Sequence, residues 1–229
     1  MTFRSAAVFL LSLIATPVIA QAPATPPPVP ADVSPLYVVT YVELKPSAKA
    51  EGAKILKSWR AAARKADGNM RLELVQSAIR PGQFAVLAAW RNKAAFDAAG
   101  EAPFREKLAA LRNSPTDDRF HNSLSVGPMD LPHGALYVVT HVDVIPPRKE
   151  DAIAALKVLG EANRAAQGNV RYEIVQQTNR PNHFTVVEVW SSRKAFDANS
   201  SSVHQREFRD KLSQMSGALY DERLYQALK

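Results

Sequence analysis

The chain has 229 residues, 16 prolines and no cysteine, and its formal net charge at pH 7 is +7. The absence of cysteine excludes disulfides and thiol chemistry, so the folded part must be stable without covalent cross-links. The basic residues are interleaved with Glu and Asp and form no dense run with aromatic residues between them. This pattern argues against nucleic-acid binding.

The first 20 residues predict an export signal. Arg4 supplies a positive charge, residues 6–14 are apolar, and Val18-Ile19-Ala20 provides a cleavage site. The apolar run is too short to span a bilayer. We therefore expect cleavage after Ala20, no stable membrane insertion, and a periplasmic or secreted protein. Residues 21–35 are rich in Pro and Ala and predict an extended linker.

The rest of the chain contains two copies of a similar sequence. Residues 36–97 and 136–197 agree at about 27 of 62 positions without a gap, far above chance. The best-matched segments are Leu36–Thr40 with Leu136–Thr140, Gly68-Asn69 with Gly168-Asn169, Trp90 with Trp190, and Ala95–Asp97 with Ala195–Asp197. We expect two small domains, residues 36–125 and 136–229, that pair as a dimer fused into a monomer.

Each repeat predicts the element order βαββαβ. A β-branched strand is followed by a helix with apolar residues at helical spacing, then by two strands joined by a tight Arg-Pro turn. A second long helix and a last strand complete the ferredoxin-like, α+β arrangement. The expected ranges are 37–44, 47–66, 70–79, 84–90, 93–111 and 119–124, then 137–144, 147–166, 170–179, 184–190, 194–215 and 223–228.

The strand at 84–90 is apolar on both faces. Phe84 and Val86 lie on one side, and Ala85 and Leu87 lie on the other. A sheet with helices on one face only should leave its other face polar. We therefore expect the second face to pack against the other repeat, which makes an intramolecular dimeric α+β barrel. Further homodimerisation of this unit stays open.

The second repeat resembles a known family. Gly168–Glu173, Arg180–Phe184, Glu188–Trp190 and His204 are similar to the antibiotic biosynthesis monooxygenase (ABM) domain, which includes small quinol monooxygenases. The resemblance covers about 90 residues of each copy. It implies a dimeric α+β barrel that oxidises electron-rich phenols with O2 and uses no cofactor.

The resemblance also implies where the site lies. The family pattern has an acidic residue before the Trp of the third strand and two histidines five residues apart on the second helix. Glu188, Trp190 and His204 match this pattern, and Asn199 replaces the first histidine. The first repeat keeps Trp90 but has Ala88 and Ala99 at the other positions. We therefore expect one working pocket, in the second repeat.

The expected chemistry is modest. A hydroquinone or anthrone reacts with O2 once it is deprotonated, so the site must hold a flat ring, remove a proton and stabilise an anion. His204 is the candidate base, because its ordinary pKa lies near neutral pH. Glu188 could orient this base or a substrate hydroxyl. Trp190 and Tyr172 could contact the ring, and Asn199 could donate a hydrogen bond.

Structural roles are the alternatives for the same residues. His204 shares a helix face with Phe208 and could be a hydrogen-bonded structural residue. Glu188 could simply pair with Arg171 or Arg180. Trp190 is present in both repeats as Trp90, which favours core packing.

Two rival functions follow from these alternatives. The first is a non-catalytic protein that binds a small apolar molecule in the same barrel. The second is binding or degradation of haem or porphyrin, although the haem ligands expected near Arg209 and Thr140 are absent. No metal site is expected, because the five histidines show no HxxxH or HxH spacing. His183 is expected in a turn, exposed to solvent.

Overall fold

The structure is a computed structural model that describes residues 35–125 and 134–228. The predicted export signal at 1–20, nearly all of the predicted linker and His133 lie outside the described residues. Among residues 35–125 and 134–228, no helix has the length and apolar character needed to cross a membrane.

Both repeats fold in the predicted order βαββαβ. The first repeat contains β1 Leu36–Glu43, η1 Pro46–Ala48, α1 Lys49–Ala63, β2 Asn69–Ser77, β3 Gln83–Trp90, α2 Lys93–Ala98, α3 Ala102–Ala109 and β4 Asp117–Ser125. The second contains β5 Leu136–Asp143, η2 Pro146–Arg148, α4 Lys149–Ala165, β6 Asn169–Gln177, β7 His183–Trp190, α5 Arg193–Ser200, α6 Val203–Ser213 and β8 Asp221–Ala227.

The prediction of one continuous second helix in each repeat was wrong, because both helices are broken. Gly100 adopts φ +68° between α2 and α3, a left-handed conformation that ends a helix and favours glycine. In the second repeat, Ser202 begins α6 afresh, since its side chain accepts a hydrogen bond from the Gln205 backbone N–H at 3.4 Å. Each repeat therefore has a short helix followed by a longer one.

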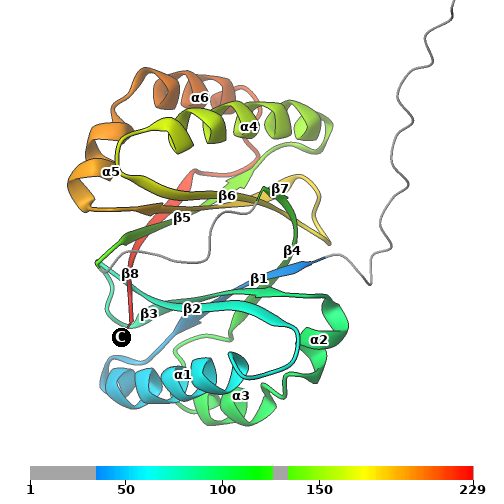
Figure 1. Cartoon of the computed structure of the whole chain (residues 1–229), viewed down its shortest axis with the longest axis vertical. Helices are drawn as coiled ribbons and strands as arrows, with labels where there is room; N and C mark the ends of the chain where they lie inside the picture. The colour runs from blue at the N-terminus through cyan, green and yellow to red at the C-terminus, as the bar shows by residue number, and fades with distance from the viewer. Residues whose placement is uncertain (1–34, 126–133, 229) are drawn as a thin grey trace, which may run out of the picture.

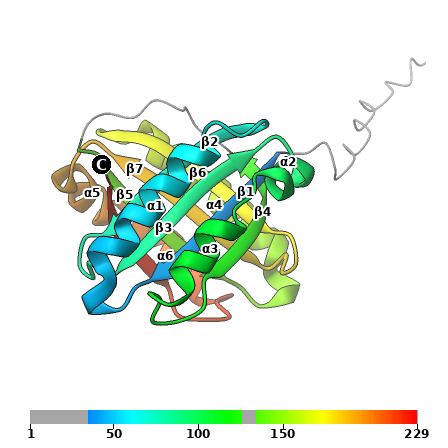
Figure 2. The same cartoon turned by 90° about the horizontal axis from the view of Figure 1, so that it is seen from below.

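The eight strands close into one barrel in the order β1-β3-β2-β8-β5-β7-β6-β4. The repeats meet at two seams: β2 pairs with β8, and β4 pairs with β6. Figure 1 shows α1 and α3 outside one side of the barrel and α4 and α6 outside the opposite side, and Figure 2 shows α1 and α3 covering the strands of the first repeat. The predicted intramolecular dimeric barrel is confirmed.

The second apolar face of β3, which was expected to pack against the other repeat, lines the barrel interior. Ala85, Leu87 and Ala89 of β3 share one buried cluster with Val187 and Val189 of β7. The alternate residues of β3, such as Val86 and Trp90, face outward and pack under α1 in a separate cluster. This two-sided burial explains why the strand has no polar face.

Four charged side chains lie inside the apolar barrel. Arg71 donates two hydrogen bonds to Glu173, both 2.8 Å long, and Arg171 donates two to Glu73, at 3.0 and 2.6 Å. The Tyr37 hydroxyl donates to Glu173 at 2.6 Å. The four charges balance, as a buried ion cluster requires. These bonds join the repeats, because each Arg pairs with a Glu of the other repeat.

The buried ion cluster also shows whether Glu188 pairs with Arg171. Arg171 points into the barrel, whereas Glu188 lies on the opposite, outward face of its sheet. The suggested pairing of Glu188 with Arg171 was therefore wrong.

Candidate active site

Strands β6 and β7 bring three of the predicted site residues together on the outward face of the second repeat. Tyr172 and Glu188 are Cα partners across the two strands, and Trp190 follows two residues later on the same face. Trp190 Nε1 donates a hydrogen bond of 2.9 Å to Glu188 Oε2. Gly160 of α4 makes room for the Tyr172 ring, because an added Cβ would lie 3.2 Å from it.

Glu188 has the most perturbed carboxyl group of this face. Its side chain is only 3% exposed, and this burial, together with the nearby Glu222 carboxylate, raises its pKa to about 7. The hydrogen bond from Trp190 and the charge of Arg209 oppose the rise. Glu188 is therefore divided between its protonated and ionised forms near neutral pH, the range in which a carboxyl group can exchange a proton during a reaction.

His204 lies in the first turn of α6, and three oxygen atoms surround its Nε2. Its Nε2 lies 3.0 Å from Asn163 Oδ1, 2.9 Å from Asn199 Oδ1 and 3.0 Å from Ser202 Oγ. Carbonyl oxygens only accept hydrogen bonds, so Nε2 must carry a proton. In the neutral ring this leaves Nδ1 with the lone pair that can accept a proton.

Asn163 is the centre of this network, and the sequence-based site omitted it. It is fully buried, and its Oδ1 accepts hydrogen bonds from Asn199 Nδ2 at 2.8 Å and from Gln205 Nε2 at 3.3 Å. A signal was present in the sequence: Asn163 continues the apolar stripe of α4 that contains Leu156 and Leu159. A polar residue on such a stripe must find partners in the core.

Tyr172 lies between the two halves of the site. Its hydroxyl is buried without a well-formed hydrogen bond, and burial raises its pKa well above the usual value. The Glu188 carboxyl group adds to this rise, while the Asn163 side chain opposes it. Tyr172 thus lies close to both Asn163 and Glu188, between the His204 side of the site and the Glu188 side.

A pocket of about 580 Å³ opens on the His204 side of the site. Its wall includes Asn199 and Ser202, which both contact His204, together with small residues such as Gly168 and Ala195. Trp190, Tyr172 and Glu188 do not line the pocket; they are 0%, 1% and 3% exposed. His204 does not line it either and adjoins it through Asn199 and Ser202. Their role in contacting a substrate stays a prediction.

The equivalent face of the first repeat has none of this polar network. The residues that correspond to Asn163, Tyr172, Glu188 and Asn199 are Ala63, Leu72, Ala88 and Ala99. Among the residues that the structure describes, the buried Trp90 Nε1 has no hydrogen-bond partner. Arg105 stacks 5.3 Å from the Trp59 ring and pairs with Asp118 and Glu101, which gives this face a different set of contacts.

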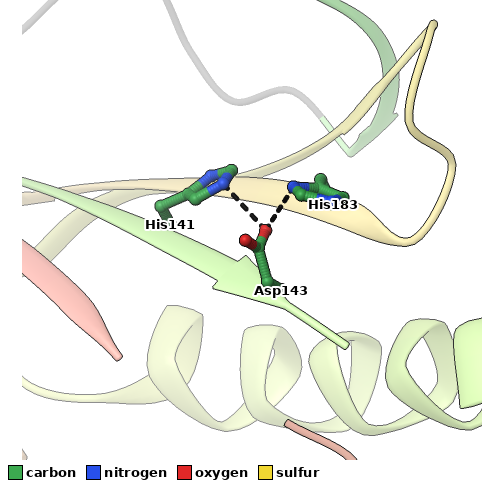
Figure 3. Close-up of side chains that lie close together, drawn as sticks. All are labelled: His141, Asp143 and His183. Atoms are coloured by element: carbon green, nitrogen blue, oxygen red, sulfur yellow. Dashed lines mark ion pairs between the residues drawn. The ribbon is translucent and has the colours of Figure 1, made fainter. Parts of the chain in front are cut away.

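A second cluster of titratable side chains was not predicted from the sequence. His183 begins β7 and its Nδ1 lies 2.5 Å from Asp143 Oδ1, so the expectation of a solvated turn residue was wrong. His141 contacts the same carboxylate oxygen (Figure 3). Histidine spacing within one element could not reveal this arrangement, because the residues come from two strands.

Comparisons with known proteins agree with the fold and the repeat. A family model described as "Antibiotic biosynthesis monooxygenase" matches residues 35–110 and again 135–211. The protein named "Putative monooxygenase YcnE" from Bacillus subtilis (strain 168) is 24% identical over 81 residues, which are 35% of this chain and 85% of that protein.

Solved structures show the same architecture in single chains. A "Putative monooxygenase" from Fusobacterium nucleatum superposes with a TM-score of 0.76 at 13% identity, covering 86% of this chain and 94% of that chain. A structure described as an "anthrone oxidase-like protein" has a TM-score of 0.69 at 13% identity, covering 88% of this chain and 94% of that chain. Because identity is low, these likenesses show the fold alone.

Proposed function

Because the chain belongs to the antibiotic biosynthesis monooxygenase family, we propose that it is a cofactor-independent monooxygenase acting from the second repeat. Its substrate would be a small aromatic molecule of the hydroquinone or anthrone type, and its oxidant O2. One observation carries this proposal. A set of buried polar residues, which includes Asn163, Tyr172 and Glu188, lies between His204 and Trp190 in the second repeat, next to a pocket. The residues of the first repeat that correspond to Asn163, Tyr172, Glu188 and Asn199 are all apolar.

The main contribution that this reaction requires from the protein is proton transfer. The substrate is itself the reductant: one oxygen atom of O2 enters the product, and the other leaves as water with two hydrogen atoms from the substrate. Deprotonation of the bound ring makes it electron-rich enough to react with O2. The protein must therefore supply a base, stabilise the anion and exclude bulk water.

His204 is the base that the geometry supports. It is half-buried beside the pocket, and its Nδ1 is left to accept the substrate proton because Nε2–H is held by Asn163 and Asn199. When the ring becomes an imidazolium, the two amide oxygens stabilise its charge. A carboxylate plays the equivalent part beside histidine in other enzymes.

Glu188 supplies a second group that can exchange a proton near neutral pH. It is closed off from the pocket, so it would act through Tyr172 and Asn163 and not by touching the substrate. In this role Glu188 is a positioning residue. Its removal should shift the pH dependence of turnover more than the substrate concentration at half-saturation.

One observation favours the second candidate, a non-catalytic binding protein. Trp190, Tyr172 and Glu188 are covered in this structure, so a ligand in the pocket would touch Asn199, Ser202, Gln167, Lys194 and the small residues around them. Such a site could hold a flat apolar molecule without reacting with it. A ligand that raises the melting temperature without any oxygen consumption would identify this function.

The first repeat provides substitutions for the test, since its residues fit the same fold. Asn163→Ala and Asn199→Ala each install the first repeat's residue and remove an oxygen atom that holds His204. We expect each to reduce oxygen uptake by about 10-fold or more, measured below the melting temperature of the variant. Full activity in both variants would refute the network as the working site.

The residues of the predicted signal support a further proposal, that the protein works outside the cytoplasm. Fractionation of cells that express the full chain tests it. The mature protein should appear in the periplasmic or extracellular fraction, shortened by the 20 residues that end at Ala20; a full-length cytoplasmic product would contradict it.

A further inference from the structure

A second site lies at one mouth of the barrel, away from the pocket. His141 and Asp143 stand at the end of β5, and His183 stands at the start of the neighbouring strand β7. Asp143 and His183 are Cα partners, and His141 precedes Asp143 by two residues, so all three share one face. It is the interior face, because Val139 and Val187 of the same strands belong to the interior cluster.

The two imidazoles converge on one carboxylate oxygen, as Figure 3 shows. His141 Nε2 lies 2.8 Å from Asp143 Oδ1, and His183 Nδ1 lies 2.5 Å from the same atom. One nitrogen or oxygen atom from each of the three residues lies within 4.8 Å of the others. From these residues we propose that His141, Asp143 and His183 form a binding site for a divalent transition-metal ion of the zinc class.

The contacts of Asp143 leave its Oδ1 available to a shared ion. Asp143 Oδ1 is buried, yet it has no hydrogen bond of acceptable geometry despite its two short contacts. Ligands of a tetrahedral zinc ion with bonds of about 2.1 Å lie about 3.4 Å apart, so small side-chain rotations suffice.

The donor set selects the class of ion. Two imidazole nitrogens and one carboxylate oxygen suit Zn²⁺, Co²⁺ and Fe²⁺, whereas Mg²⁺ and Ca²⁺ prefer oxygen ligands alone. The three side chains are 13%, 16% and 17% exposed, which leaves a path from solvent and a position for water.

The surrounding charges permit a cation here. Arg119 of β4 opposes both histidines, but it pairs with Asp117 at 2.8 Å, and Asp221 opposite His141 pairs with Arg223. His121 is engaged with Thr185, and Arg180 is exposed. Burial lowers the pKa of both cluster histidines, which favours the neutral rings that bind metals.

The first repeat shows that the fold does not require these histidines. The residues at the corresponding positions are Tyr41, Glu43 and Gln83, and they close the same end of the barrel. The two histidines therefore appear only in the second repeat, where β5 and β7 place them against one carboxylate. A packing role alone would not need a donor of this kind.

Titration of tag-free, chelator-treated protein with Co²⁺ and Zn²⁺ tests the site. We expect one Co²⁺ per chain, with visible d–d absorption, displaced by one Zn²⁺. His141→Tyr and His183→Gln, which install the first repeat's residues, should each weaken Zn²⁺ binding by at least roughly 10-fold. Glu43→Gln, the matched control in the first repeat, and His204→Asn should bind as the wild type does.

Two results would overturn the proposal. One is wild-type protein that takes up no stoichiometric Co²⁺, which requires no variant to be folded. The other is unchanged Zn²⁺ affinity in His183→Gln. Both results leave the monooxygenase proposal untouched, since it concerns the outer face of the barrel and is measured in metal-free protein.

Discussion

Removing Glu173 should strongly destabilise the barrel, because its carboxylate is fully buried. It accepts two hydrogen bonds from Arg71 and one from Tyr37, at 2.6–2.8 Å. In Glu173→Ala, the nearest remaining carboxylate to Arg71 is Glu73, 3.7 Å away and already paired with Arg171. One net positive charge then stays in an apolar interior.

Breaking a buried ion pair by removing one partner costs about 3–5 kcal/mol. The whole free energy of unfolding of a domain is about 5–15 kcal/mol, so a loss of this size is readily measured. Urea unfolding followed by circular dichroism gives the difference from wild type. A loss below about 1 kcal/mol would refute the reasoning, because it would mean that the Arg71 charge is not buried as the structure shows.

A second variant separates the unpaired charge from the lost contact. Tyr37→Phe/Arg71→Met/Glu173→Leu removes the connected polar groups together and leaves two balanced charges, Glu73 and Arg171. Replacing a buried ion pair by apolar residues is often neutral or stabilising. We expect the triple variant to be more stable than Glu173→Ala. Equal instability would show that packing, and not charge, accounts for the effect.

Two further predictions concern the second repeat. Burial raises the pKa of Glu188 from 4.5 to about 7, so the folded protein binds this proton more tightly than the unfolded chain does. The protonated Glu188 therefore contributes its full share to the free energy of unfolding below about pH 4.5. This contribution is lost as the pH rises through about 7. Between about pH 5 and pH 8 the wild type should lose about 3 kcal/mol more than Glu188→Gln, and parallel urea-unfolding curves at the two pH values would contradict this. Gly168 has φ +86°, and an added Cβ would lie 2.6 Å from Ala195 Cβ, so Gly168→Ala should lower the free energy of unfolding by about 1–3 kcal/mol. Gly134 has φ +79°, and no atom of the described residues lies within 4 Å of an added Cβ, so Gly134→Ala should cost less. Equal losses in the two glycine variants would remove the steric part of this explanation.

Much of the fold could be predicted because the two repeats can be aligned with each other. Matched residues fixed the element order in both halves, and the two apolar faces of β3 required a second layer of cover. The seams between β2 and β8 and between β4 and β6 could not be predicted, since edge strands carry no local signal for their partner. The break at Gly100 was missed because the helical pattern resumes directly after it.

The interior charges had a sequence signal that went unused. Arg71 and Glu73 recur as Arg171 and Glu173, two residues apart and on the same face of a strand. Their crossed pairing needs the barrel to be closed, which no single repeat reveals.

The candidate site was partly predictable for a similar reason. His204 and Asn199 were found because the family pattern spaces them along one helix, and the structure brings them together through Asn163. Asn163 lies on a different helix, and His141 and His183 lie on different strands. Contacts across elements depend on register, which residue spacing within one element does not contain.

Oxygen uptake by the metal-free mature protein, with a panel of small quinols and anthrones, tests the proposed function most directly. Wild type should consume O2 faster than the substrate autoxidises. His204→Ala should lose this activity at an unchanged melting temperature, and His183→Gln, a histidine replaced outside the pocket, should keep it. No uptake by the wild type across the panel, or full uptake by His204→Ala, would contradict a cofactor-independent monooxygenase working from the second repeat.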